Sequence, residues 1–309
     1  MQRTSAWIIG IAVIVLAAVI GFLLLSGGSD EAPPGASEQP SQSAAPSASA
    51  SVAADLLERR WTVLYVGTDA NERRESAGEP INTDALMLVS LSADQSELTL
   101  VSLPRDVVDV PLPDGGAYDD KITTLHRERG MESLVGAMEA LYGVPIDAHI
   151  ALDMDDFARL VGAAGGVEVS PDAPITDPIV NLDLEAGPQQ LDASQALGYV
   201  RTRVDQDYGR MARQQEVLVA LVERLVNPDA GIDLRGLLDG LESLETDLPL
   251  DQLSSLVELA RRASEAQVTE VVIQPPLITF EGDRGDGRGY VLEADFEAIR
   301  TEVQGLIGE

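Results

Sequence analysis

The sequence predicts an α/β fold, with a central mixed β-sheet sandwiched between helices in three layers and preceded by one transmembrane helix. Short aliphatic stretches alternate with stretches of helical spacing from residue 56 to residue 309. Apolar residues often run consecutively in the short stretches, which is typical of strands covered on both faces. An uncharged run over residues 7–25 precedes them. We therefore expect a membrane-anchored protein with one folded domain.

The run from Trp7 to Leu25, WIIGIAVIVLAAVIGFLLL, carries no charge. At a rise of about 1.5 Å per residue it spans roughly the hydrocarbon core of a bilayer. Arg3 precedes the run and Asp30 follows it, so the positive-inside tendency places residues 1–6 in the cytoplasm and the rest outside. A cleaved signal peptide is the alternative, but the run is long for one and no clear A-x-A site closes it.

Residues 26–54 consist almost entirely of Ser, Ala, Pro and Gly. Such a composition cannot bury enough apolar area to offset the entropy lost on ordering. This segment is predicted to be a flexible tether between the membrane and the folded domain. No linker interrupts residues 56–309, which indicates a single domain.

The elements of this domain follow from the local pattern. Strands are predicted at WTVLYVG (61–67), ALMLVSLS (85–92), LTLVSLP (98–104) and AHIALD (148–153). Helical spacing marks MESLVGAMEALYG, DMDDFARLVGAAGG and RMARQQEVLVALVERLVN. The remainder predicts helices near 234–245 and 251–265, a strand at VTEVVIQ and a last helix in EADFEAIRTEVQGLI.

Composition excludes several classes of function. The formal net charge is -31, with 52 acidic against 21 basic residues, so the average surface repels nucleic acid and anionic headgroups. Cysteine is absent and only two histidines occur, which removes thiol chemistry and makes a zinc enzyme improbable. Any anion site must therefore be built locally.

Arginines nevertheless concentrate in YVRTRVDQDYGRMARQQ (199–215). A strand over YVRTRV would place Arg201 and Arg203 on one side. A helix beginning near Arg210 would place Gln214 on the same face as Arg210 and bring Arg213 close by. Guanidiniums and a helix N-terminus favour anions, so the segment predicts a phosphate or pyrophosphate cradle. The alternative is surface ion pairing with nearby carboxylates: Asp205, Asp207 and Glu216.

Acidic residues gather at predicted strand ends. Asp69 follows the first strand, Asp84 immediately precedes the second, and Arg105 and Asp106 follow the third. Two carboxylates that meet at such an edge suit Mg²⁺, which usually shares its coordination with substrate phosphates. Lys121, the only lysine in the chain, lies nearby in the sequence and is a further candidate with Asp106.

In this order, the segments resemble the LytR-CpsA-Psr family of bacterial cell-wall enzymes. The resemblance is clear over about residues 60–227, in LYVGTDA, NTDALMLVSL, LTLVSLPRDV, DKIT, GVPIDAHIALDMDDFARLVGAAGGVEV and LDASQALGYVRTRVDQDYGRMARQQ. It implies a phosphotransferase, in the bacterial cell membrane, that moves a glycopolymer from an undecaprenyl-pyrophosphate carrier onto peptidoglycan through a phosphodiester. There are three departures from the family pattern. Asn82 stands two residues before the second aspartate, where the family usually has arginine, and Arg73 is only an offset candidate for the arginine expected soon after the first aspartate. Lys121 is followed by IT rather than the usual IN.

The resemblance also implies roles for individual residues. Asp69 and Asp84 would be the catalytic and metal-site carboxylates, with Mg²⁺ or Mn²⁺ as cofactor, and Arg105 would lie beside the reacting phosphate. The pyrophosphate would be held by Arg201, Arg203, Arg210, Arg213 and Gln214. Two alternatives stay open: a lipid-pyrophosphate hydrolase, and a non-catalytic protein that binds wall polymers.

Overall fold

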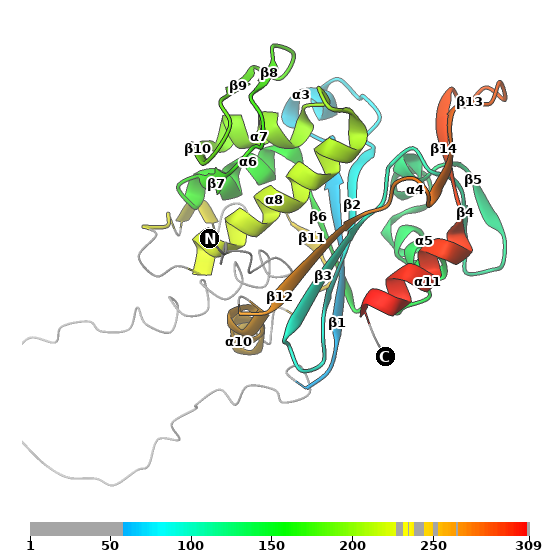
Figure 1. Cartoon of the computed structure of the whole chain (residues 1–309), viewed down its shortest axis with the longest axis horizontal. Helices are drawn as coiled ribbons and strands as arrows, with labels where there is room; N and C mark the ends of the chain where they lie inside the picture. The colour runs from blue at the N-terminus through cyan, green and yellow to red at the C-terminus, as the bar shows by residue number, and fades with distance from the viewer. Residues whose placement is uncertain are drawn as a thin grey trace, which may run out of the picture.

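The computed structural model describes residues 58–226, 231–233, 235–237, 244–249, 253–263 and 265–307. Within them the centre is a six-stranded sheet of order β11-β6-β1-β2-β3-β12 (Figure 1). β1 runs antiparallel to β2 and parallel to β6, so the sheet is mixed, as predicted. The strands are β1 (Trp61–Thr68), β2 (Thr83–Leu91), β3 (Glu97–Ser102), β6 (Ala148–Leu152), β11 (Glu245–Thr246) and β12 (Gln267–Val272).

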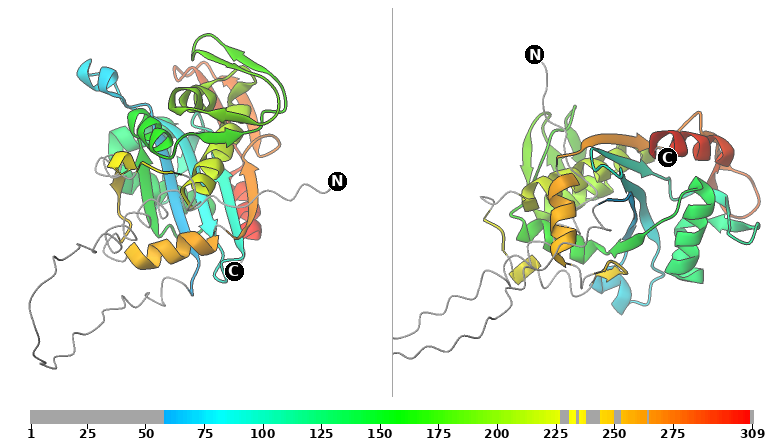
Figure 2. Two further views of the ribbon diagram at one scale, coloured as in Figure 1. Left: turned by 90° about the vertical axis from the view of Figure 1, so that its left-hand side faces the viewer. Right: turned by 90° about the horizontal axis from the view of Figure 1, so that it is seen from below.

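Helices cover both faces of the sheet. One hydrophobic core joins the sheet to α6 (Met154–Ala163), α7 (Ala193–Arg201), α8 (Gln206–Val226) and α10 (Leu253–Ala263). A second core lies on the other face, with α4 (Ile122–Arg129), α5 (Met131–Tyr142) and α11 (Phe296–Ile307). Seen from below in Figure 2, the strands run between α10 on one side and α5 and α11 on the other.

Burial on both faces explains the consecutive apolar residues of the strands. In β1, Trp61 and Val63 join the first core, while Leu64 and Val66 join the second. All four side chains are buried. Successive residues of a strand point to opposite faces, so a strand covered on both sides requires an apolar residue at nearly every position.

Small hairpins and one short helix decorate this core. The pairs are β4 (Val108–Pro111) with β5 (Ala117–Lys121), β7 (Val167–Val169) with β10 (Gln189–Leu191), β8 (Ile175–Asp177) with β9 (Leu182–Leu184), and β13 (Ile278–Asp283) with β14 (Tyr290–Ala294). Helix α3 (Glu72–Ser76) lies in the connection between β1 and β2. The strands of these hairpins have three to six residues, which is too short to show a clear alternation of apolar and polar residues in the sequence.

The strand predicted over YVRTRV is wrong, because α7 continues through Tyr199 to Arg201. The Asp192 side chain caps this helix by accepting from the Gln195 backbone N–H, and the Gln195 side-chain oxygen accepts from the Asp192 backbone N–H. Such a capping box starts a helix strongly enough to outweigh the strand-like pattern of the next residues. The following helix, α8, begins at Gln206 rather than near residue 210.

The distal elements agree with the sequence where they are described. The predicted strand VTEVVIQ corresponds to β12, and the helix predicted over 251–265 corresponds to α10. Of the helix predicted over 234–245, the structure describes residues 235–237 and 244–245, and Glu245 belongs to β11 instead.

The predicted membrane span at 7–25 and the tether at 26–54 lie outside the described residues. Among those that the structure describes, no helix is both long and apolar enough to cross a bilayer. The anchor therefore stays a prediction.

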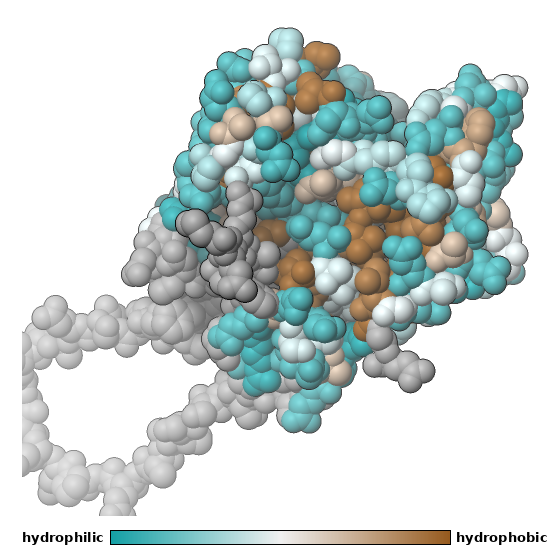
Figure 3. All heavy atoms as spheres, in the orientation of Figure 1, coloured by the Kyte–Doolittle hydropathy of each residue, from teal (hydrophilic) through white to brown (hydrophobic). Residues whose placement is uncertain are grey.

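On the face drawn in Figure 3, hydrophobic side chains gather in the hollow between two mainly hydrophilic lobes.

Candidate functional site

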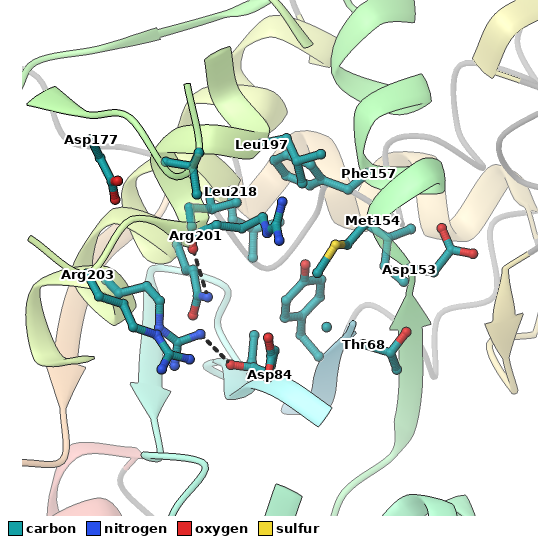
Figure 4. Close-up of a pocket in the computed structure, with 18 of the residues that line it drawn as sticks. Thr68, Asp84, Asp153, Met154, Phe157, Asp177, Leu197, Arg201, Arg203 and Leu218 are labelled. Carbon is teal, nitrogen blue, oxygen red and sulfur yellow. Dashed lines mark hydrogen bonds between the residues drawn. The ribbon is translucent and has the colours of Figure 1, made fainter. Parts of the chain in front are cut away.

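A pocket of about 320 Å³ lies at the end of the sheet where β1 and β6 finish and β2 begins. Gly67, Thr68 and Asp84 form its floor, and α6, α7 and α8 supply its walls. Figure 4 shows Arg203 beside Asp84 at one end, with Phe157, Met154 and Leu197 toward the other. The pocket thus has a charged end and an apolar end.

Five of the ten side chains predicted for the site line the pocket: Asp84, Arg201, Arg203, Arg210 and Gln214. Arg201 comes from the last turn of α7, Arg203 from the link between helices, and Arg210 and Gln214 from one face of α8. The Gln214 side chain also donates to the backbone carbonyl of Val200 at 3.2 Å, which ties α8 to α7. Although the strand over 199–204 does not exist, both of its arginines line the pocket.

Arg210 is held in place by Asp207, which the sequence analysis considered only as a surface ion-pair partner. Its Nε and one Nη atom donate to the two Asp207 carboxylate oxygens, at 3.0 and 2.9 Å. The other Nη atom donates to the backbone carbonyl of Asp84 at 2.8 Å. Burial alone would raise the pKa of Asp207, but the bonds and charge of Arg210 outweigh it and lower the pKa. Asp207 therefore stays ionised and fixes the guanidinium.

Positive charge converges on this end of the pocket. The pKa of Arg203 is lowered, first by burial and then by the guanidiniums of Arg105 and Arg210. The carboxylates of Asp207 and Asp84 oppose this effect but do not cancel it, so an anion bound beside Arg203 would further stabilise its charge. The arrangement therefore suits a ligand with several negative charges, such as a pyrophosphate.

Behind Asp84 lies a chain of ion pairs. Arg105 donates to the Asp84 carboxylate, and Lys121 approaches Asp106 at 3.1 Å. Burial would lower the pKa of Arg105, but the carboxylates of Asp84 and Asp106 more than offset this and raise it. Arg105, Asp106 and Lys121 do not line the pocket, so they act on it through Asp84.

The two aspartates proposed for a metal occupy different settings. Asp84 is the second residue of β2, and the prediction that it precedes the strand is wrong. Asp69 lies outside the pocket lining. Its carboxylate accepts from the Asn82 backbone N–H at 2.7 Å and pairs with Arg74 at 3.1 Å. Among the described residues, no three acidic or histidine side chains cluster as a metal site.

Arg213, which was predicted to help hold the pyrophosphate, does not line this pocket. Its buried guanidinium donates to the backbone carbonyls of Tyr199 and Thr202, at 3.0 and 2.6 Å, and to Asp205 at 2.6 Å. These bonds fold the link that carries Arg201 and Arg203. Arg213 is displaced around the helix from Arg210 and Gln214, so it faces this link instead of the pocket. Arg213 positions the site instead of lining it.

The sequence analysis missed the apolar end of the pocket. Its side chains come from β1, β6, three helices and the turn between β8 and β9: Tyr65, Leu152, Met154, Phe157, Ile179, Val180, Leu197, Val200 and Leu218. One signal was available in α8, because Leu218 follows Arg210 and Gln214 at four-residue spacing. The other members lie far apart in the chain and meet only in the folded domain.

Comparison with known proteins identifies a family and several relatives. Residues 29–301 match the model of the LytR_cpsA_psr family. LcpB of Corynebacterium glutamicum, described as a probable cell wall biosynthesis protein, is 36% identical over 178 residues, which cover 53% of this chain and 42% of that protein. TagU of Enterococcus faecalis, a polyisoprenyl-teichoic acid–peptidoglycan teichoic acid transferase, is 26% identical over 249 residues, covering 79% and 78%.

Solved structures share the fold. Bacillus subtilis TagV superposes with a TM-score of 0.63 at 23% identity, covering 81% of this chain and 98% of that one. TagT bound to LIIa-WTA gives a TM-score of 0.64 at 23% identity, covering 82% and 93%. The match spans 42% of LcpB and 64% of the biofilm regulatory protein A of Streptococcus mutans. Because the family model matches most of the chain, this protein belongs to the LytR_cpsA_psr family.

Proposed function

We propose that this chain is a membrane-anchored phosphotransferase that moves a glycopolymer from a polyprenyl-pyrophosphate carrier to peptidoglycan through a phosphodiester bond. The observation that carries the proposal is the division of one pocket into a guanidinium end and an apolar end. A lipid pyrophosphate likewise consists of a charged part, the pyrophosphate, joined to an apolar part, the lipid chain. Relatives named as teichoic acid transferases that act on polyisoprenyl-linked donors support this substrate class.

The residues of the pocket suggest how the reaction proceeds. Arg203 and Arg210 bind pyrophosphate oxygens, Asp207 holds Arg210, and Gln214 completes this wall. A hydroxyl of the acceptor sugar attacks the glycan-side phosphorus, and polyprenyl phosphate leaves as its bond to that phosphorus breaks. The hydroxyl proton passes to solvent or a nearby carboxylate. The guanidiniums stabilise charge on the phosphoryl oxygens and the leaving group.

Mg²⁺ is part of this proposal. The carboxylates of Asp84, in β2, and of Asp69, just after the end of β1, are hard oxygen donors, and Mg²⁺ commonly takes one or two carboxylates together with substrate phosphates. When bound, the ion would neutralise phosphate charge. Asp84 faces the pocket directly, whereas Asp69 would have to exchange its contact with Arg74.

The test supplies full-length protein with a lipid-pyrophosphate-linked oligosaccharide, peptidoglycan fragments and Mg²⁺. Mass spectrometry follows release of polyprenyl phosphate and the destination of the sugar. A phosphodiester-linked product supports the transferase. Release of sugar phosphate at a rate independent of acceptor would instead identify a hydrolase, and binding with neither product would identify a binding protein.

A further inference from the structure

A groove of about 1190 Å³ adjoins the pocket. It shares four lining residues with the pocket, which therefore form the boundary between the two: Asp153, Met154, Leu197 and Arg201. Its other lining residues come from α3 with its N-cap and from α6: Asn71, Glu72, Arg73, Glu75, Asp155, Ala158 and Arg159. A ligand in the groove would lie next to one in the pocket, with Arg201 within reach of both.

The outer wall of the groove is fixed to the domain. The backbone N–H of Glu72 donates to the Asp155 carboxylate at 2.8 Å, and that of Met154 donates to the carbonyl of Ala70 at 3.1 Å. Asn71 caps α3 by accepting from the Arg74 N–H at 3.1 Å. These bonds join the connection between β1 and β2 to the start of α6. The groove is therefore a built feature of the fold.

The groove has a larger share of charged lining residues than the pocket, seven of eleven against six of nineteen. Both signs of charge line it, and Met154, Ala158 and Leu197 add apolar surface. Arg73 is 77% exposed and approaches Glu79 only at 3.8 Å. Carboxylates accept hydrogen bonds from hydroxyl and amide groups, and guanidiniums donate to hydroxyls and carboxylates. Mixed charge of this kind suits a polar ligand of low net charge better than a polyanion or a lipid chain.

Building on the proposed transferase, we propose that this groove binds the acceptor, an oligosaccharide of peptidoglycan that carries hydroxyl, amide and carboxylate groups. The pocket is filled by the donor's lipid and pyrophosphate. The acceptor hydroxyl must reach the phosphorus from a side that the lipid does not occupy. The groove opens on that boundary at Arg201, and its donors and acceptors match those of a peptidoglycan sugar with its peptide.

The test measures direct binding, which does not depend on turnover. Full-length protein in detergent is titrated calorimetrically with a soluble disaccharide-peptide fragment of peptidoglycan, with and without a short-chain polyprenyl pyrophosphate. The fragment should bind in both cases, because the two ligands occupy adjacent sites. Failure of the wild-type protein to bind the fragment, or displacement of the fragment by the lipid, would overturn the proposal whether or not transfer is observed.

Variants locate the fragment. Arg73→Ala and Ala158→Trp, which remove a donor and fill the groove, should each weaken fragment binding about tenfold or more while the affinity for the lipid stays within about twofold. Arg235→Ala, which changes an exposed arginine outside both the pocket and the groove, is the matched control. If both variants bind the fragment like the wild type and retain its thermal unfolding temperature, the acceptor does not bind in this groove. An equal loss of lipid affinity would assign the groove to the donor.

Discussion

The Arg210 guanidinium donates to the backbone carbonyl of Asp84 at 2.8 Å, across 126 residues of sequence. This bond joins the first turns of α8 to the start of β2. Since Asp207 binds the other side of the same guanidinium, Arg210 is positioned before any ligand arrives. An anion that binds a guanidinium already held in place avoids the entropy cost of ordering that side chain, which favours affinity.

Arg203 and Arg213 should respond to substitution in opposite ways. Arg203→Ala should weaken polyprenyl-pyrophosphate binding by about 1.5 to 3 kcal/mol and leave the unfolding free energy nearly unchanged, because the side chain is 45% exposed and lines the pocket. Arg213→Ala should lower the unfolding free energy by about 2 to 4 kcal/mol, because it leaves two buried carbonyls without a donor. Urea titration and ligand titration separate the two effects. Equal losses of stability in both variants would contradict the assignment.

Asp84→Asn should reduce turnover by about a hundredfold or more, because it removes charge at the phosphate end with little change in shape. Lipid binding should change much less, since the arginines supply most of the attraction. Turnover is followed by polyprenyl phosphate release over a Mg²⁺ titration. Asp172→Asn is the control, because it makes the same chemical change at an exposed carboxylate outside the pocket lining. Full activity of Asp84→Asn would remove this carboxylate from the mechanism.

Asp207 predicts a dependence of stability on pH. Its pKa is lowered in the folded state, by Arg210 against the effect of burial. A depressed pKa contributes stability that is present above the unfolded value of about 3.9 and is lost as pH falls through the folded value. Wild-type protein should exceed Asp207→Asn in unfolding free energy by about 1 to 2 kcal/mol at pH 7, and the difference should shrink as pH falls below about 4. Asp172→Asn, at an exposed carboxylate, corrects for net charge. A difference independent of pH would be inconsistent with the ionised contact.

The apolar end should select for the lipid chain. Leu218→Trp should fill part of the pocket and weaken binding of a long-chain polyprenyl pyrophosphate about tenfold or more, with little effect on inorganic pyrophosphate. Val219→Trp is the matched control, because the next residue of α8 lines a different part of the surface. Equal effects of Leu218→Trp on both ligands would mean that the chain does not bind there.

Topology follows from the charges that flank residues 7–25. Protease added to intact spheroplasts should digest the protein beyond about residue 30, because the positive-inside tendency places that part outside the membrane. The same treatment after lysis is the reference. Protection of the domain in intact spheroplasts would reverse the predicted orientation.

Local sequence patterns predicted which site residues share a face of a helix, but not how the elements pack around the site. Arg210 and Gln214 could be placed together because four-residue spacing on a helix fixes their common face. Arg201 and Arg203 line the pocket for a reason that the sequence analysis did not give, since α7 ends at Arg201 and the next residues form a link. The role of Arg213 depends on the path of that link, which no periodicity encodes.

The apolar end shows the same limit more clearly. Tyr65, Phe157 and Leu197 belong to a strand and two helices, and each carries only the local pattern of an ordinary core residue. Whether such a residue fills the core or lines a cavity depends on how closely the elements approach in the folded protein. By contrast, β1 and β2 were predictable, because burial on both faces leaves consecutive apolar residues in them, whereas the two-residue strand β11 was not.

Helix α3 lines the groove but not the pocket. This helix lies in the connection between β1 and β2, whose register is fixed by the cross-strand pairs from Trp61↔Leu91 to Gly67↔Ala85. The strands therefore fix the pocket at Gly67, Thr68 and Asp84, whereas residues 71–75 contribute to the groove alone. If this connection contacts the acceptor, grafting it between family members would exchange the preferred wall sugar and leave the lipid carrier unchanged.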